Sequence, residues 1–345
     1  MPLPRDLLLQ LIERRDLSQA QAEELLTQLT DPQLPPALAG ALLSALAAKG
    51  VVADEARGFA QAMRRLARRP PLPAGLRAID IVGTGGDASG SLNISTGTAL
   101  LTAACGVPVV KHGNRSVSSR CGSADVLEEL GLPVPLEEAA AAACLAATGF
   151  TFLFAPHYHP ATRAITPIRA ALGVRTVFNI LGPLVNPAQP PLHLVGAYSL
   201  DVARLIAHTF QGLPIERTFV VHGAAGWDEP TPIGPFTVFD VRPGEVTHSV
   251  RTPEAYGLTR CAAADLAGGD ARHNAAAIRA VLRGEEHGAH RDCLLLGTAL
   301  ALEVAGEVHS AAAGMARAAA AIESGSAARL LEALARHPAA AGSPA

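Results

Sequence analysis

Residues 78–105 read AIDIVGTGGDASGSLNISTGTALLTAAC. The apolar run at 78–82 has the length and composition of a buried strand, and residues 96–105 have those of a helix. Between them lie GTGGD at 83–87 and NIST at 93–96, where Ser95 and Thr96 are natural helix caps. A strand, a glycine-rich loop and a helix in this order predict one unit of an α/β sheet.

The same alternation continues along the chain. Further strands are predicted at 107–110, 151–155, 192–197, 218–222 and 236–241, and further helices at 123–130, 136–148 and 199–211. The tail from about 272 to 336 is predicted to be helical. Strands that alternate with helices predict a mostly parallel sheet flanked by helices, which is the α/β fold class.

A different pattern precedes this region. Residues 4–69 carry leucines and alanines at helical spacing, with helices expected over 36–49 and 53–69, and Pro70-Pro71-Leu72-Pro73 then breaks the pattern. We therefore expect a small N-terminal helical domain over residues 1–72 and a larger α/β domain over residues 73–345. Part of 157–187, which is proline-rich and has a helical pattern at 160–172, is expected to join the helical domain in space and leave a cleft between the domains.

Composition excludes several classes of protein. The net charge of -3 argues against a general nucleic-acid binder, which would need a basic face. Five cysteines without metal or disulfide spacing suggest reduced thiols. The first residues lack a secretory pattern and no uncharged apolar run is long enough for a bilayer, so the sequence predicts a cytoplasmic protein with no membrane partner.

The glycine-rich loop at 83–87 predicts an anion site. Glycines let backbone amides approach an anion closely, and the helix start that follows is a second anion-binding device. Taken alone, the loop is equally compatible with a plain turn. It has neither the GxGxxG form nor the Walker form, which disfavours a dehydrogenase or a Walker-type nucleotide site.

Two further segments follow predicted strands. KHGNRS at 111–116 and SSRCGSAD at 118–125 follow the strand 107–110, and the predicted function is a loop that closes over a polyanion, with Lys111 as a point charge on phosphate. An exposed mobile loop is the alternative. Asp228-Glu229 follows the strand 218–222 and offers the oxygen ligands that Mg²⁺ requires, although adjacent carboxylates are more often a solvated pair.

These four segments, together with RTVFNILGPLVNP at 175–187, resemble the anthranilate phosphoribosyltransferase family. The resemblance extends over nearly the whole chain, including Asn274 and the helical tail. It implies a fold of the nucleoside phosphorylase and phosphoribosyltransferase type, with a homodimer formed through the N-terminal helices. It also implies transfer of the phosphoribosyl group of phosphoribosyl pyrophosphate to anthranilate in tryptophan biosynthesis.

The resemblance also implies the residues of the site. Phosphoribosyl pyrophosphate would be held by Gly83, Gly85, Gly86, Asp87, Asn93, Ser95, Thr96, Lys111, His112, Gly113 and Ser123. Two Mg²⁺ ions per subunit would use Ser95, Asp228 and Glu229. Anthranilate would contact Gly83, Asn114, His159, Arg169 and Gly182. Without the resemblance, His159 could be a helix cap or a packed histidine, and Arg169 a surface ion pair.

No residue is assigned as a general base, because the amine of anthranilate is already a neutral nucleophile. Three positions depart from the family pattern: Cys121, Trp227 before the acidic pair, and Gly297, which is expected to weaken its helix by roughly 1 kcal/mol at most. The rival functions are a nucleoside phosphorylase of the same fold and a non-catalytic paralogue that binds nucleic acid. The intact GTGGD loop and acidic pair, with Asn114 after Gly113, favour the transferase.

Overall fold

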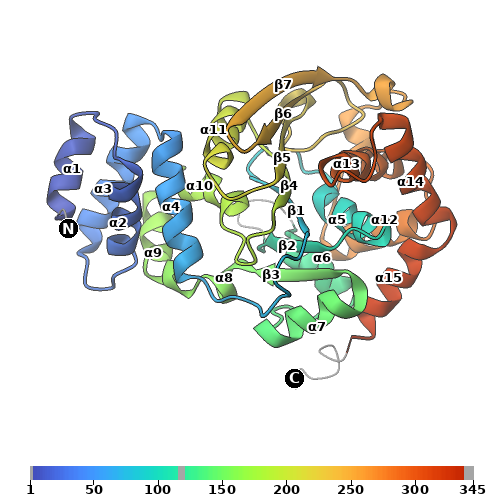
Figure 1. Ribbon diagram of the computed structural model, residues 1–345, viewed down its shortest axis with the longest axis horizontal. Helices are drawn as coiled ribbons and strands as arrows, with labels where there is room; N and C mark the ends of the chain where they lie inside the picture. The colour runs from blue at the N-terminus through green and yellow to red at the C-terminus, as the bar shows by residue number, and fades with distance from the viewer. Residues whose placement is uncertain (1–2, 116–120, 338–345) are drawn as a thin grey trace.

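The computed structural model describes residues 3–115 and 121–337, which form a small helical unit beside a larger α/β unit (Figure 1). The helical unit contains α1 (Pro4–Ile12), α2 (Gln19–Leu29), α3 (Pro36–Lys49) and α4 (Ala53–Leu66). Helix α2 begins at a capping box, in which the Ser18 hydroxyl accepts from the Gln21 amide at 3.2 Å and the Gln21 side chain accepts from the Ser18 amide at 2.9 Å. Helix α4 ends three residues before the predicted end at 69.

The sheet has seven strands in the order β3-β2-β1-β4-β5-β6-β7. They are β1 (Ile79–Gly83), β2 (Val109–Gly113), β3 (Phe150–Phe154), β4 (Leu192–Gly196), β5 (Arg217–His222), β6 (Phe236–Arg242) and β7 (Glu245–Arg251). Strands β1 to β5 pair in parallel, and β6 and β7 pair antiparallel. The mostly parallel sheet is therefore confirmed. Strand β7 was not predicted, because it is an exposed edge strand with few apolar residues.

Helices cover both faces of the sheet (Figure 1). One face is covered by α5 (Ile94–Ala104), α6 (Ser123–Glu129), α7 (Glu138–Thr148), α12 (Ala271–Leu282), α13 (Ala289–Val304), α14 (Ala311–Glu323) and α15 (Ser326–Ala335). The other face carries α11 (Leu200–Gln211). Short 3-10 turns occur at Ala224–Gly226, Pro253–Tyr256 and Ala263–Leu266. No helix within the described residues is long and apolar enough to cross a membrane.

Between β3 and β4 the chain leaves the sheet and runs along the helical unit. This excursion contains α8 (Ala155–Tyr158), η1 (Pro160–Ala164), α9 (Thr166–Leu172), α10 (Phe178–Leu181) and η2 (Gly182–Leu184). Helix α9 packs against α3, and Ile165 and Phe178 lie in the same apolar core as α1–α4. The helix predicted over 160–172 is wrong in its continuity, because Pro167 fits only the first turn of a new helix.

Gly297 has a packing role that its sequence position did not reveal. It lies in α13 where that helix contacts α5, and a Cβ atom there would sit 2.6 Å from Oγ1 of Thr98. A Cβ on Gly97, in α5, would likewise sit 2.7 Å from Leu294. The expectation that Gly297 only weakens its helix is therefore wrong, because the missing side chain lets two buried helices approach closely.

We predict that Gly297→Ala lowers stability although alanine is the better helix former. The clash with Thr98 costs about 1–3 kcal/mol of overpacking, which exceeds the gain in helix propensity of at most about 1 kcal/mol. Thermal unfolding of the variant should show a lower melting temperature. In a Thr98→Ala background the same change should be neutral or stabilising, and a stabilised single variant would contradict the packing role.

Candidate active site

The predicted motifs meet at the carboxyl ends of the parallel strands. GTGGD begins at the last residue of β1, and the segment with Asp228 and Glu229 follows β5. Lys111, His112 and Gly113 lie within β2, three residues beyond the predicted end of that strand. Carboxyl ends of parallel strands are where open α/β sheets bind ligands.

The glycine loop presents unpaired backbone amides. Gly85, Gly86 and Ala88 have φ values of 67°, 77° and 56°, a left-handed conformation that alanine rarely adopts. The amides of Gly86, Asp87 and Ala88 donate to no acceptor among the described residues. Successive free amides in such a turn form a concavity for an anion, so the loop is more than a plain turn.

At the strand ends Asp228 is buried and Glu229 beside it is half-buried. The Asp228 carboxylate accepts from the Gly85 amide at 2.6 Å, and the Glu229 carboxylate accepts from the Ser95 amide at 3.0 Å. Burial, together with the charge of Asp87, raises the pKa of Asp228 to about 7, and burial and Asp228 raise the pKa of Glu229. The interpretation as a solvated pair is therefore wrong, since Asp228 is only 7% exposed.

The Asp228 amide donates to the Asp87 carboxylate at 3.4 Å, so Asp87, Asp228 and Glu229 gather negative charge at this edge, with the Ser95 hydroxyl nearby. This charge favours a bound cation. Hard oxygen donors of this kind suit Mg²⁺. The carboxylate and hydroxyl oxygens are the reason that these residues fit Mg²⁺.

Lys111 lies beneath the glycine loop rather than on a surface loop. It is 2% exposed, and its ammonium donates to the Ile81 carbonyl and to the Ser95 hydroxyl, the latter at 3.3 Å. Burial lowers its pKa, and the charges of Asp80, Glu229 and Asp228 oppose that shift. Lys111 thus acts as the buried counter-charge of the acidic cluster in this structure.

The start of α5 differs from the prediction. The helix begins at Ile94 with Asn93 as its N-cap residue, so Ser95 and Thr96 lie inside its first turn and the capping prediction is wrong. The Asn93 side chain instead donates to the Cys121 carbonyl at 3.3 Å and accepts from Asn274 at 2.8 Å. Thr96 is fully buried, and its hydroxyl has no partner among the described residues.

Two histidines and the excursion meet beside the loop. His112 Nδ1 lies 3.1 Å from the Gly182 carbonyl, and because a carbonyl only accepts, Nδ1 carries the proton. The rings of His112 and His159 pack edge to face with centroids 5.1 Å apart. Burial lowers the pKa of His112 to about 3 and that of His159 to about 4, so both are neutral at pH 7. His159 makes no side-chain cap, so the interpretation as a helix cap is wrong, and the residue is 3% exposed.

Arg169 lies on α9, at the edge of this group. Its guanidinium sits over the Phe178 ring at 5.0 Å, and burial lowers its pKa. It forms no ion pair among the described residues, so the surface ion-pair interpretation is wrong. A partly desolvated cation without an acidic partner is a candidate for binding an anion.

The loop after β2 is only partly described. Ser123 donates to the Asn114 carbonyl at 3.2 Å, and a Cβ on Gly113 would lie 2.4 Å from the Ser123 hydroxyl. Residues 116–120, which belong to the predicted closing loop, lie outside the described residues. Of the departures from the family pattern, Cys121 is buried, and Trp227 fills the core below the acidic pair.

Three further residues had no predicted role, although Arg175 and Asn186 lie in the 175–187 motif: Asp80, Asn186 and Arg175. Asp80 is fully buried in β1 and accepts from the His112 amide at 3.1 Å and from the Asn186 side chain at 2.9 Å. Arg175 donates to the Gly86 carbonyl at 2.6 Å. A single aspartate inside an apolar strand could have indicated a role for Asp80 and its partner Asn186. No local sequence pattern indicates the contact of Arg175 with the glycine loop.

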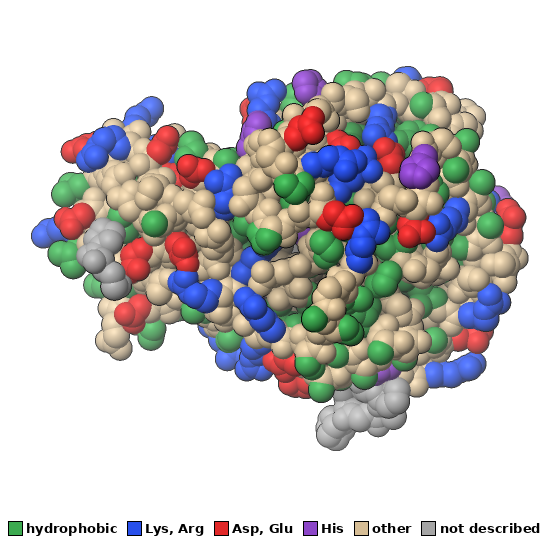
Figure 2. Space-filling view, in the orientation of Figure 1, with side chains coloured by type: hydrophobic (Ala, Val, Ile, Leu, Met, Phe, Trp, Pro, Cys, Tyr) green, Lys and Arg blue, Asp and Glu red, His purple; other side chains and the backbone are tan. Residues whose placement is uncertain are grey.

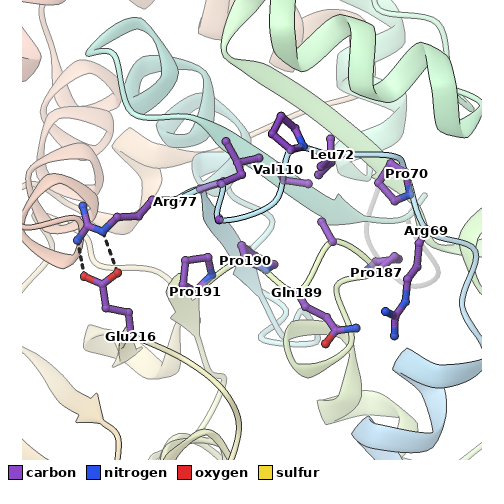
Figure 3. Close-up of a pocket in the computed structure, with 15 residues that line it drawn as sticks. Arg69, Pro70, Leu72, Arg77, Val110, Pro187, Gln189, Pro190, Pro191 and Glu216 are labelled. Carbon is purple, nitrogen blue, oxygen red and sulfur yellow. Dashed lines mark hydrogen bonds and ion pairs between the residues drawn. The ribbon is translucent and has the colours of Figure 1, made fainter.

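A cavity of about 580 Å³ lies at the opposite edge of the sheet (Figure 3). It is walled by the linker residues 69–78 and by 187–191, and the Arg77–Glu216 ion pair closes one end at 2.6 Å. None of the predicted site residues lines it. On the face shown in Figure 2, Lys and Arg side chains are interspersed with Asp and Glu rather than gathered into one broad basic surface.

Comparisons with known proteins agree with this geometry. The model of the glycosyl transferase family helical bundle domain matches residues 5–67, and that of the glycosyl transferase family a/b domain matches residues 75–328. The anthranilate phosphoribosyltransferase of a Synechococcus species is 45% identical over 321 residues, covering 93% of each chain. That of Rubrobacter xylanophilus is 45% identical over 316 residues, covering 92% of each.

The chain belongs to the anthranilate phosphoribosyltransferase family. Solved structures of the family share its fold. The Thermus thermophilus enzyme is 40% identical with a TM-score of 0.89, covering 95% of this chain and 97% of its own. The Saccharomyces cerevisiae enzyme in complex with PRPP and Mg is 27% identical with a TM-score of 0.89, covering 99% and 98%. These relatives support the transferase rather than a nucleoside phosphorylase or a nucleic-acid-binding paralogue.

We predict that Asp228→Asn lowers turnover by about a hundredfold or more, because a metal ligand contributes several kcal/mol. The amide keeps an acceptor for the Gly85 amide and removes one of three repelling charges. The melting temperature without metal should therefore stay the same or rise. A variant that loses both turnover and stability would show that the carboxylate serves the fold instead.

Proposed function

We propose that the carboxyl edge of this sheet transfers the phosphoribosyl group of 5-phosphoribosyl 1-pyrophosphate to the amine of anthranilate. The products are N-(5-phosphoribosyl)anthranilate and pyrophosphate, a step of tryptophan biosynthesis. The observation that carries the proposal is the row of amides without acceptors at Gly86, Asp87 and Ala88, beside the negative charge of Asp228 and Glu229. A polyphosphate accepts hydrogen bonds from the amides, and a divalent cation bound with it offsets the charge of the carboxylates.

The phosphates are assigned to the glycine loop and its neighbours. The backbone amides of Gly86, Asp87 and Ala88 meet the pyrophosphate. The remaining residues of this side are Gly83, Gly85, Asn93, Ser95, Thr96, Lys111, His112, Gly113 and Ser123. Helix α5 directs its N-terminus at the same place, which favours negative charge. Lys111, which lies in β2, contributes a positive charge.

Mg²⁺ is assigned to Ser95, Asp228 and Glu229, with two ions per subunit. The complex of the yeast relative with PRPP and Mg supports the use of Mg²⁺. Bound there, Mg²⁺ offsets the charge of the leaving pyrophosphate. The chain contributes the carboxylates of Asp228 and Glu229 and the Ser95 hydroxyl. Their oxygen atoms are the metal ligands, and they are in place before the substrate binds.

Anthranilate is assigned to the side that the excursion forms. Gly83, Asn114, His159, Arg169 and Gly182 are the proposed contacts, and Arg169 is the cation for its carboxylate. Two yeast structures contain 4-fluoroanthranilate, which shows that relatives bind such a ring. The hydrogen bond between His112 and the Gly182 carbonyl joins this side to the phosphate side.

The chemistry needs positioning more than proton removal. The amine is neutral, and the neutral histidines beside it provide no strong base. Fixed amides, Lys111 and the carboxylate cluster stabilise charge that gathers on pyrophosphate as the ribosyl C1 bond breaks. The transition state is then oxocarbenium-like, with attack from the opposite face and inversion at C1.

The experiment that tests this function follows anthranilate fluorescence. The signal should fall when the protein is mixed with phosphoribosyl pyrophosphate and Mg²⁺, and should stay constant if either is omitted. Full turnover in excess chelator would remove the metal assignment. Turnover of a nucleoside with phosphate in place of anthranilate would favour the phosphorylase.

We predict that Arg169→Ala raises KM for anthranilate about ten- to a hundredfold with little change in kcat. The variant removes a charge-assisted contact of roughly 1.5–3 kcal/mol that serves ground and transition states alike. Steady-state kinetics with each substrate varied should show KM for phosphoribosyl pyrophosphate nearly constant. Should only the latter change, Arg169 belongs to the phosphate side.

A homodimer through the helical unit is the second part of the proposal. Leu3, Leu9 and Ile12 on and beside α1 are exposed by 65%, 53% and 62%. A cavity of about 740 Å³ with apolar walls from α3 and α9 lies on the same unit, and α1 packs against α3. Hydrophobic side chains are visible at this end of the molecule (Figure 2). An apolar face of this kind fits a second copy of the chain.

We predict that Leu9→Glu with Ile12→Glu converts a dimer to a monomer, because two buried charges at an interface are costly. Sedimentation analysis should show half the mass. Val250→Glu is the matched control, since Val250 is 66% exposed on β7 in the α/β unit. A monomeric wild type, or an unchanged dimer in the double variant, would contradict this interface.

The proposed location is the cytoplasm. None of the five cysteines forms a disulfide within the described residues, as expected of a reducing compartment.

A further inference from the structure

Arg175 connects the excursion to the glycine loop. It lies between α9 and α10, and its guanidinium donates to the Gly86 carbonyl at 2.6 Å. The guanidinium carbon also lies over the Tyr198 ring, 4.1 Å from its centroid, in the loop after β4. It forms no ion pair with any described residue, although three carboxylates lie at the other side of the loop.

The hydrogen bond fixes the direction of one peptide group. In a trans peptide the carbonyl and the following amide point in opposite directions. Because Arg175 draws the Gly86 carbonyl toward itself, the Asp87 amide must point away from Arg175. That amide is one of the three that have no acceptor among the described residues.

Glycine at position 86 is favoured by its backbone conformation, and it leaves room for the Arg175 guanidinium. Its φ of 77° is left-handed, and a Cβ there would lie 3.4 Å from the Arg175 guanidinium. Tyr198 is tied to the loop as well, because its amide donates to the Thr84 hydroxyl at 3.2 Å. Arg175 is therefore held by a ring on one side and meets the loop on the other.

We propose that Arg175, braced on Tyr198, is a positioning residue that turns the Gly86–Asp87 peptide so that its amide faces the pyrophosphate. The inference rests on the proposed function of the glycine loop. A guanidinium suits this role better than an ammonium, because it stacks on an aromatic face and donates in its own plane. Arg175 also follows α9, the helix that carries Arg169, along the chain.

The first test replaces Arg175 by alanine in the full-length protein. KM for phosphoribosyl pyrophosphate and the calorimetric Kd of pyrophosphate with Mg²⁺ should each rise about tenfold, the loss expected for one charge-assisted hydrogen bond. KM for anthranilate should stay within about twofold, and the melting temperature should hold because the side chain is exposed. A change confined to anthranilate would overturn the inference.

Arg175→Lys separates positioning from charge. Lysine keeps the positive charge but cannot stack as a planar fork, so pyrophosphate should bind nearly as weakly as to the alanine variant. Wild-type affinity in Arg175→Lys would mean that charge alone is needed, and would overturn the inference. Arg204→Ala, which removes an exposed arginine from α11, is the matched control and should change neither constant.

A further test replaces Tyr198, the ring on which Arg175 lies. Tyr198→Ser should weaken pyrophosphate binding as Arg175→Ala does, whereas Tyr198→Phe keeps the ring face and should restore it. The double variant Arg175→Ala with Tyr198→Ser should be no weaker than either single variant, because both remove the same device. Additive losses would show that the two side chains act separately.

The two failures are distinguishable. If the wild type binds no pyrophosphate with Mg²⁺, the proposed phosphate site is wrong. If the wild type binds it and Arg175→Ala binds it equally well, only the positioning role is wrong.

Discussion

The site depends on one close approach, that of the Asp228 backbone to the ends of two neighbouring strands. A Cβ on Gly196 would lie 1.6 Å from the Asp228 carbonyl oxygen, and a Cβ on Gly83 would lie 2.4 Å from its carboxylate. Glycine at the last residue of β1 and of β4 therefore lets the segment after β5 cross the sheet edge. Only this crossing brings the acidic pair to the glycine loop, since the two segments are about 140 residues apart in sequence.

The close approach of Asp228 to the strand ends places several negative charges near one another. Asp87, Asp228 and Glu229 repel one another in a buried place, which raises the pKa of the last two. Lys111 is the buried cation that offsets this charge, and it is itself desolvated. Such a cluster is unfavourable for the isolated chain and becomes favourable when a cation and a polyphosphate share it. The arrangement therefore favours ligand binding over stability.

The second constraint is the excursion between β3 and β4. It packs on the helical unit through α9 and Phe178, yet returns to the sheet edge, where the Gly182 carbonyl meets His112. Arg175 and Asn186 make two more contacts from the same segment, to Gly86 and to Asp80. The proposed anthranilate side and phosphate side are thus joined by hydrogen bonds from one continuous piece of chain.

Every strand except β7, most helix positions and the identity of the polar motifs could be predicted from the sequence. Apolar periodicity and glycine placement are local properties, and they fixed the parallel strands within a few residues. Helix continuity at 160–172 and the start of α5 were wrong, because a proline's position in the first turn and an asparagine engaged elsewhere are settled by packing.

Only the tertiary structure decided what each motif residue faces. Lys111 became a buried counter-charge, Gly297 a packing contact and Arg175 a partner of the loop, because each depends on an element distant in sequence. Side-chain environment and pKa follow from three-dimensional proximity, which local pattern does not encode.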